Sequence, residues 1–185
     1  MDSQTHYCKN QGSFPLDKFH QKGTEKGKGV LLVGESPAPN GWRLSGKACY
    51  DTNGKLLATG KRLNQLLSDL SLSVETCGFT ELAKCYVGKD KQSLEKCCVG
   101  CWPIFKRQIK CANYKLLIIL GVKTLKIFNK LCNTQLTTGV LVQVTIDNKH
   151  YFVLGIYHPS PINPHGQKKN LEIFGRVKES LLKII

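Results

Sequence analysis

A chain of 185 residues, 41% of them hydrophobic, is long enough to bury a full core and is most simply one globular domain. Its 27 lysine and arginine residues against 13 aspartate and glutamate residues give a net charge of +14, which favours a polyanionic partner over a merely basic protein, because cations that neutralise phosphates release counterions. The sequence has no run of about 18 apolar residues and no apolar N-terminal leader, so we expect no membrane partner and a cytoplasmic location.

Short apolar runs alternate with segments of helical periodicity, which predicts a three-layer α/β/α sandwich with a small, mostly parallel central sheet. We predict one domain over residues 1–185, in which a basic, lysine- and glycine-rich arm over 1–28 precedes an α/β core over 29–185. The predicted elements in chain order are a strand at 30–33, a helix opening at 59, a strand at 79–87, a helix at 93–110 broken or kinked at Pro103, a strand at 114–121, a helix from 122, a hairpin within 139–156 that ends in the last strand, and a helix at 168–185.

Two polar loops follow the first and the last of these strands. The first loop begins at Gly34 and carries Glu35 and Asn40 among prolines and glycines, which fix the backbone and let it pass close to a ligand. The second begins Tyr157-His158-Pro159-Ser160-Pro161. Open α/β sheets bind ligands at the carboxyl ends of their strands, so we expect Glu35 and His158 to share a site. Taken alone, a histidine that only caps a strand end is an equally good account of His158.

Together, Gly34-Glu35-Ser36-Pro37 and His158-Pro159-Ser160-Pro161 resemble the first and last motifs of the uracil-DNA glycosylase superfamily. The resemblance covers residues 29–185, and within the superfamily the chain looks most similar to the family-4-type glycosylases that contain an iron–sulfur cluster. It implies a uracil-DNA glycosylase-like fold and an enzyme that hydrolyses the N-glycosidic bond of a flipped uracil or other deaminated base, in base excision repair of DNA.

The resemblance also implies a role for each site residue. His158 would donate a hydrogen bond to the oxyanion that develops on the leaving base, and Glu35 would orient water or stabilise the cationic sugar. The predicted sets are catalytic Glu35 and His158; base-binding Gly34, Ser36, Pro37, Asn40, Tyr50 and Glu81; and DNA-binding Ser160, Pro161, Ile162, His165, Lys168 and Lys169.

Nine cysteines are a high count for an intracellular protein, in which disulfides are rare. Cys97 and Cys101 are four residues apart and therefore lie on one face of the predicted helix, whereas Cys98 points about 100° away from Cys97. The spacing favours Cys98 as a packed residue and the other two as candidate ligands.

In the family-4-type pattern, Cys85 at a strand end and Cys101 before Trp102 match two ligands of a cluster. Cys8 matches the first cysteine of a pair in the arm, but the second position is Gln11. We predict that a cluster staples the arm to the sheet, with Cys98 as an alternative to Cys97 and with structural zinc or no metal as the other outcomes. The predicted ligands of the [4Fe-4S] cluster are Cys8, Cys85, Cys97 and Cys101.

Two positions depart from the family pattern. Glu81 stands where the family has the asparagine that reads the edge of uracil, and an ionised carboxylate would repel O4 of that base, so Glu81 is protonated, the base differs, or the match is off by one residue. Cys49 stands where the family has an aromatic platform, and Tyr50 is the substitute. The competing functions are a glycosylase-fold module that binds nucleic acid without cutting it and a hydrolase of nucleosides or nucleotides. We expect a monomer whose partner is DNA.

Overall fold

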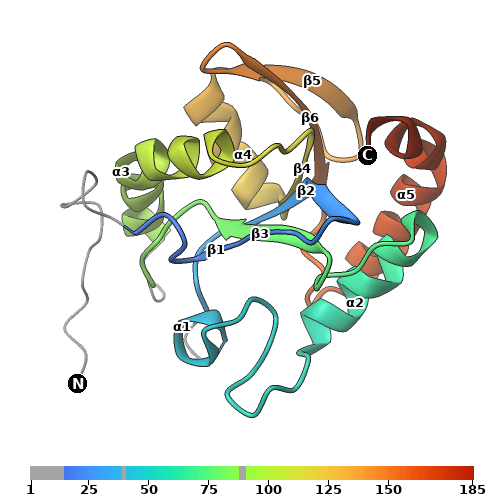
Figure 1. The fold of residues 1–185 in the computed structure, drawn as a ribbon, viewed down its shortest axis with the longest axis horizontal. Coiled ribbons are helices and arrows are strands. Elements are labelled where there is room, and N and C mark those ends of the chain that lie inside the picture. The colour runs from blue at the N-terminus through green and yellow to red at the C-terminus, as the bar shows by residue number, and fades with distance from the viewer. Residues whose placement is uncertain (1–14, 39–40, 88–90) are drawn as a thin grey trace.

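The structure is a computed structural model that describes residues 15–38, 41–87 and 91–185, and it contains one mixed sheet between two helical layers (Figure 1). Within the described residues, no helix is long and apolar enough to cross a membrane. The elements are β1 (His20–Gln21), β2 (Gly27–Gly34), α1 (Trp42–Ser45), α2 (Ala58–Leu67) continued by the short 3₁₀ helix η2 (Ser68–Leu70), β3 (Cys77–Glu81), α3 (Lys91–Lys110), β4 (Leu116–Leu120), α4 (Val122–Cys132), β5 (Leu141–Ile146), β6 (Lys149–Ile156) and α5 (Pro164–Ile184).

The sheet has the strand order β1-β3-β2-β4-β6-β5. Its four inner strands are parallel, and β1 and β5 pair antiparallel at the two edges. The carboxyl ends of β2, β3, β4 and β6 therefore meet at one edge, where Gly34 pairs with Glu81 and Leu120 pairs with Ile156. The predicted three-layer, mostly parallel sandwich is confirmed.

The central strand β4 divides the core into two halves. Its Leu117 and Ile119 face a cluster built with α3 and α4, while Leu116 and Ile118 face a cluster built with α2 and α5. These helix pairs cover opposite faces of the sheet (Figure 1). Each fully buried aliphatic side chain contributes roughly 1.5–3 kcal/mol of transfer free energy, so the buried run of β4 anchors both layers.

Two elements differ from the sequence prediction. The strand predicted at 79–87 is wrong at its far end, because β3 ends at Glu81 and the chain then follows the first loop, with the Leu82 amide donating to the Gly34 carbonyl at 2.9 Å. The helix predicted to be broken or kinked at Pro103 is not broken, because α3 continues through that residue. Val99, whose carbonyl loses its helical partner there, is exposed, so water can satisfy it.

The ends of the chain also differ. The segment predicted as an arm over 1–28 contributes β1 and the first residues of β2 to the sheet. The last helix begins four residues before the predicted 168, because Asn163 accepts a hydrogen bond from the Gly166 amide and Pro164 occupies the first turn. This earlier start brings α5 up to the edge of the sheet where the inner strands end.

Candidate active site

The ends of β4 and β6 bring His158 to the edge of the sheet. The Gly121 amide donates to the Ile156 carbonyl at 2.8 Å, and a Cβ placed on Gly121 would lie 3.4 Å from Cβ of His158. Gly121 has a φ of 108°, which favours glycine. His158 therefore stands directly beside the turn between β4 and α4.

The loop that carries His158 is held from both sides. Asn170 of α5 is fully buried, accepts a hydrogen bond from the Tyr157 amide at 2.9 Å and donates one to the Tyr157 carbonyl at 2.8 Å. Arg62 of α2 donates to the Ser160 carbonyl at 2.6 Å. Two buried or charged side chains thus fix the backbone on each side of His158, which pre-organises its imidazole.

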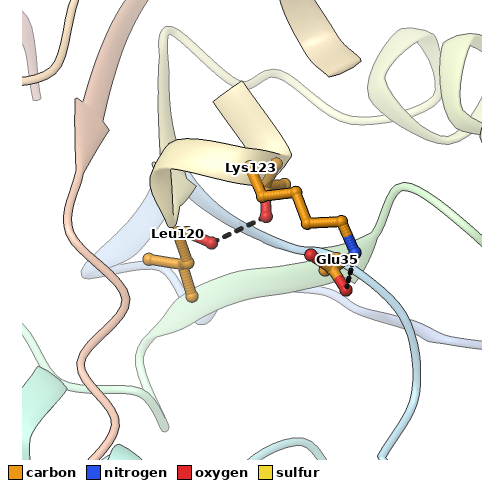
Figure 2. A network of polar contacts seen from close by, with 4 residues as sticks. Glu35, Leu120 and Lys123 are labelled. Carbon is orange, nitrogen blue, oxygen red and sulfur yellow. Dashed lines mark hydrogen bonds and ion pairs between the residues drawn. The ribbon is translucent and has the colours of Figure 1, made fainter. Parts of the chain in front are cut away.

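Glu35 follows β2 at the same edge. Its carbonyl accepts a hydrogen bond from the Ala83 amide at 3.0 Å, so the backbone of this loop is tied to the segment after β3. Lys123, in the first turn of α4, extends toward the loop after β2 and places Nζ 3.4 Å from Oε1 of Glu35 (Figure 2). The Thr124 hydroxyl donates to the Leu120 carbonyl at 2.9 Å and secures the start of that helix. The Glu35 carboxylate therefore has a cation beside it and partial contact with solvent.

The environment of His158 favours a neutral imidazole. His158 is exposed on one side, but the protein atoms on its other sides remove enough hydration to lower its pKa below the usual value. Glu35 acts in the opposite direction. The two predicted catalytic residues are thus close enough for one to influence the ionisation of the other.

A buried carboxyl and a buried amine lie at the end of β3. The Lys84 ammonium donates to the Thr80 hydroxyl at 2.7 Å and to the Glu81 carbonyl. Burial raises the pKa of Glu81 to about 8, and burial lowers the pKa of Lys84 to about 7. Within the described residues, Oε2 of Glu81 has no hydrogen-bond partner.

The cysteines of the predicted cluster are partly assembled. The thiol of Cys101 hydrogen-bonds that of Cys85, which together with burial raises the pKa of Cys101, and the Lys84 amide donates to Sγ of Cys101 at 3.2 Å. Cys97 and Cys98 are buried in the same half of the core. In residues 15–38, 41–87 and 91–185, no three His, Cys, Asp or Glu side chains gather closely enough to hold a metal ion. Cys8 lies outside these residues.

The other predicted site residues are spread along the same edge and its loops. Ser160, Pro161 and Ile162 lie in the loop before α5, and Ile162 is 92% exposed. The exposed residues His165, Lys168 and Lys169 are in the first turns of α5. In the first loop, Ser36 is half-buried and Pro37 is buried, and Asn40 lies outside the described residues.

Tyr50, predicted as a stacking platform, hydrogen-bonds Glu75 at 2.5 Å, before the start of β3. Lys47 lies over the ring of Tyr50, 3.9 Å from its centroid. Burial raises the pKa of the neighbouring residue Cys49, and the charge of Glu81 raises it further by a smaller amount. The stacking role of Tyr50 stays a prediction.

Comparison with known proteins identifies the family. The family model of the Uracil DNA glycosylase superfamily matches residues 20–182. The chain belongs to the uracil-DNA glycosylase superfamily. It is therefore a DNA glycosylase by class, a hydrolase of N-glycosyl bonds. The chain is similar to a protein named type-4 uracil-DNA glycosylase from Saccharolobus solfataricus, with 28% identity over 159 residues, which are 82% of this chain and 71% of the relative. The superfamily predicted from the two motifs is confirmed.

Sequence reasoning missed three residues that position the candidate site. Asn170 and Arg62 hold the His158 loop, and Lys123 pairs with Glu35. Only Asn170 had a signal in the sequence, because an asparagine on the apolar face of a helix must find hydrogen-bond partners. Lys123 and Arg62 look like ordinary surface cations until the fold brings distant segments together.

Proposed function

We propose that this glycosylase removes a flipped uracil or another deaminated base from DNA in base excision repair, with Glu35 and His158 as its catalytic residues. The observation that carries the proposal is the meeting of Glu35 and His158 at one sheet edge, where the charge of Glu35 acts on the pKa of His158. A surplus of positive charge, +14 over the chain, suits a DNA substrate.

His158 acts on the leaving base. As the glycosidic bond breaks, negative charge develops on the base, and an N–H donor at that point stabilises the transition state more than the ground state. The lowered pKa of His158 favours the neutral imidazole, which still carries one N–H that it can donate to the base. The pinned loop at Tyr157 and Ser160 limits the reorganisation that this contact requires.

Glu35 acts on the sugar side. A carboxylate at this point stabilises the oxocarbenium-like sugar and orients the attacking water. Lys123, with Nζ 3.4 Å from Oε1, holds the Glu35 carboxylate in place and leaves it partly open to solvent, from which water must come.

The loop before α5 supports the extruded nucleotide. Ile162 is almost fully exposed, which is unusual for a large apolar side chain and suits insertion into the gap left in the base stack. Lys168 and Lys169 in the following turns supply charge for flanking phosphates. Flipping a base costs a few kcal/mol, which these contacts would offset.

The assay for this function is release of a base. Oligonucleotides that carry uracil, hypoxanthine or xanthine, in single and double strands, are incubated with the protein and then treated with alkali to cut at abasic sites. We expect release from at least one of them, reduced at least about 100-fold by His158→Ala or Glu35→Ala, as is typical when a transition-state donor is removed. Absence of release from every substrate contradicts the proposal.

A module that binds damaged DNA without cutting it is the second candidate, favoured by Glu81 and Cys49 at positions where the family has other residues. It predicts salt-sensitive binding in the same assay with no release, and unchanged binding in Glu35→Ala.

We also propose that Cys85 and Cys101 hold an iron–sulfur cluster together with Cys97 and Cys8. The support is the contact of two thiols and the Lys84 amide that donates to one of them, since hydrogen bonds to sulfur accompany such clusters. A bound cluster would supply a structural link between the N-terminal segment, the end of β3 and α3. Iron and sulfide analysis of anaerobically purified protein tests it, and a protein that contains neither iron nor zinc contradicts it.

A further inference from the structure

The Glu81 carboxyl occupies an unusual position at the end of β3. The residue is 8% exposed, and its Oε2 has no hydrogen-bond partner among the described residues, although leaving a buried polar atom unpaired is costly. A Cβ on Gly34 would collide with this oxygen, so the carboxyl packs against the backbone immediately before Glu35. Cys49, on the loop after α1, is near enough for the charge of Glu81 to raise its pKa. An unpaired acid therefore lies within the candidate active site.

The groups that face this carboxyl come from three segments. Lys84, after β3, donates to the Glu81 carbonyl and favours the ionised carboxylate, while Glu35, after β2, disfavours it. Cys49 is itself held as a neutral thiol, because burial raises its pKa to about 12. Burial is the largest influence on Glu81 and raises its pKa to about 8. The balance of these influences favours the protonated carboxylic acid, which has one O–H donor beside one carbonyl acceptor.

We propose that Glu81 reads the Watson–Crick edge of the excised base as a neutral carboxylic acid, which selects bases that present an N–H next to a carbonyl. This inference rests on the proposed function. Uracil presents N3–H beside O4. The hydroxyl of the acid donates to O4 of the base, and the carbonyl of the acid accepts from N3–H. Hypoxanthine and xanthine present the same pair. The ionised carboxylate has only acceptors and repels the carbonyl of the base. Glu81 therefore performs the reading task of an amide only while it keeps its proton.

A glutamine at position 81 separates the effect of the carboxyl proton from the effect of side-chain shape. Glu81→Gln keeps the size of the side chain and a donor beside an acceptor at every pH. We expect Glu81→Gln to release uracil within about threefold of the natural protein at pH 7. Above about pH 8 the natural protein should lose roughly tenfold per pH unit relative to Glu81→Gln, as one essential proton is lost. Glu179→Gln, an exposed residue late in α5, is the matched control and should follow the natural protein. Identical pH profiles for the natural protein and Glu81→Gln overturn the inference.

Two further measurements distinguish this inference from the function on which it rests. Infrared difference spectra should show the carbonyl stretch of a protonated carboxyl at pH 7 that is absent from Glu81→Gln, and its absence from the natural protein overturns the inference without reference to activity. If no protein releases a base, the proposed glycosylase function fails, and the preference for a uracil-containing strand over an undamaged strand is then compared at pH 7 and pH 9. A preference that only Glu81→Gln keeps at pH 9 supports the reading role, and equal pH dependence in both proteins overturns it.

Discussion

A substitution of Lys123 measures how much the catalytic arrangement depends on the contact between Lys123 and Glu35, which the sequence alone does not reveal. The Lys123 and Glu35 side chains are 47% and 33% exposed, so the pair contributes no more than about 1 kcal/mol to folding. The pair matters more for the orientation of the Glu35 side chain than for folding, because the cation sets the direction in which the carboxylate points. We expect Lys123→Gln to reduce base release about three- to tenfold at low salt and to leave the thermal midpoint within about 4 °C.

Lys126→Gln, an exposed residue on the same helix, carries the same loss of charge and is the control for this measurement. Because salt screens partly exposed charges, the difference between the natural protein and Lys123→Gln should shrink as salt rises. An equal loss of activity in Lys126→Gln would mean that general charge, and not the contact with Glu35, causes the effect.

At this same scale, the strand-end pattern predicted Glu35 and His158 because it depends only on where apolar runs stop. The hydrogen bonds of Asn170 to Tyr157 join residues 13 positions apart, and the ion pair of Lys123 with Glu35 joins residues 88 apart. Such pairings depend on the direction of side chains at a sheet edge, which local periodicity does not encode.

The edge strand β1 carries a buried histidine that couples the stability of the fold to pH. His20 is 5% exposed, and one of its ring nitrogens lies 2.8 Å from the Tyr114 hydroxyl. Burial, with a smaller contribution from Lys84, lowers the pKa of His20 to about 4 from a usual 6.5. The unfolded chain therefore takes up the proton first as the pH falls, so stability is complete above about pH 6.5 and is lost between about pH 6.5 and 4.

Urea unfolding at pH 7 and pH 4 measures this loss. We expect the natural protein to lose up to about 3 kcal/mol more than His20→Gln over this range, since one pKa unit corresponds to about 1.4 kcal/mol. Other groups that titrate in the range affect both proteins alike. His150→Gln, an exposed histidine in the hairpin, should behave as the natural protein does. Parallel curves for the natural protein and His20→Gln would show that the imidazole does not resist protonation.

Elements with strong apolar periodicity were predictable, and elements fixed by tertiary contacts were not. The buried run of β4 and the turn at Asp147 and Asn148, both with positive φ, matched the prediction because local chemistry specifies them. The two residues of β1 carry no recognisable pattern, and they become a strand only because the β3 edge offers hydrogen bonds. The early end of β3 similarly follows from pairing with the first loop.

At the scale of the molecule, the parallel sheet explains why charged side chains from distant segments can act at one site. The carboxyl ends of four strands gather Glu35, Glu81 and His158 at one edge, and α5 begins there at Pro164. A helix of 21 residues is about 30 Å long, so α5 ends far from this edge. Lys168 and Lys169 thus lie near the site, whereas Lys183 and Lys115 line a hollow beside the opposite ends of the strands.

The salt dependence of DNA binding distinguishes local contact from general attraction. The logarithm of the binding constant falls with the logarithm of salt concentration by about 0.7 per neutralised phosphate on single strands and about 0.9 on double strands. If Lys168 and Lys169 each contact a phosphate, Lys168→Gln/Lys169→Gln should reduce the slope by about 1.4 or 1.8 respectively. Lys115→Gln/Lys183→Gln also removes two positive charges from the net +14, and it should leave the slope unchanged. Equal changes in both double variants would mean that the whole positive surface attracts DNA without a preferred edge. The sheet edge that carries His158 would then bind its substrate through contacts with the base alone.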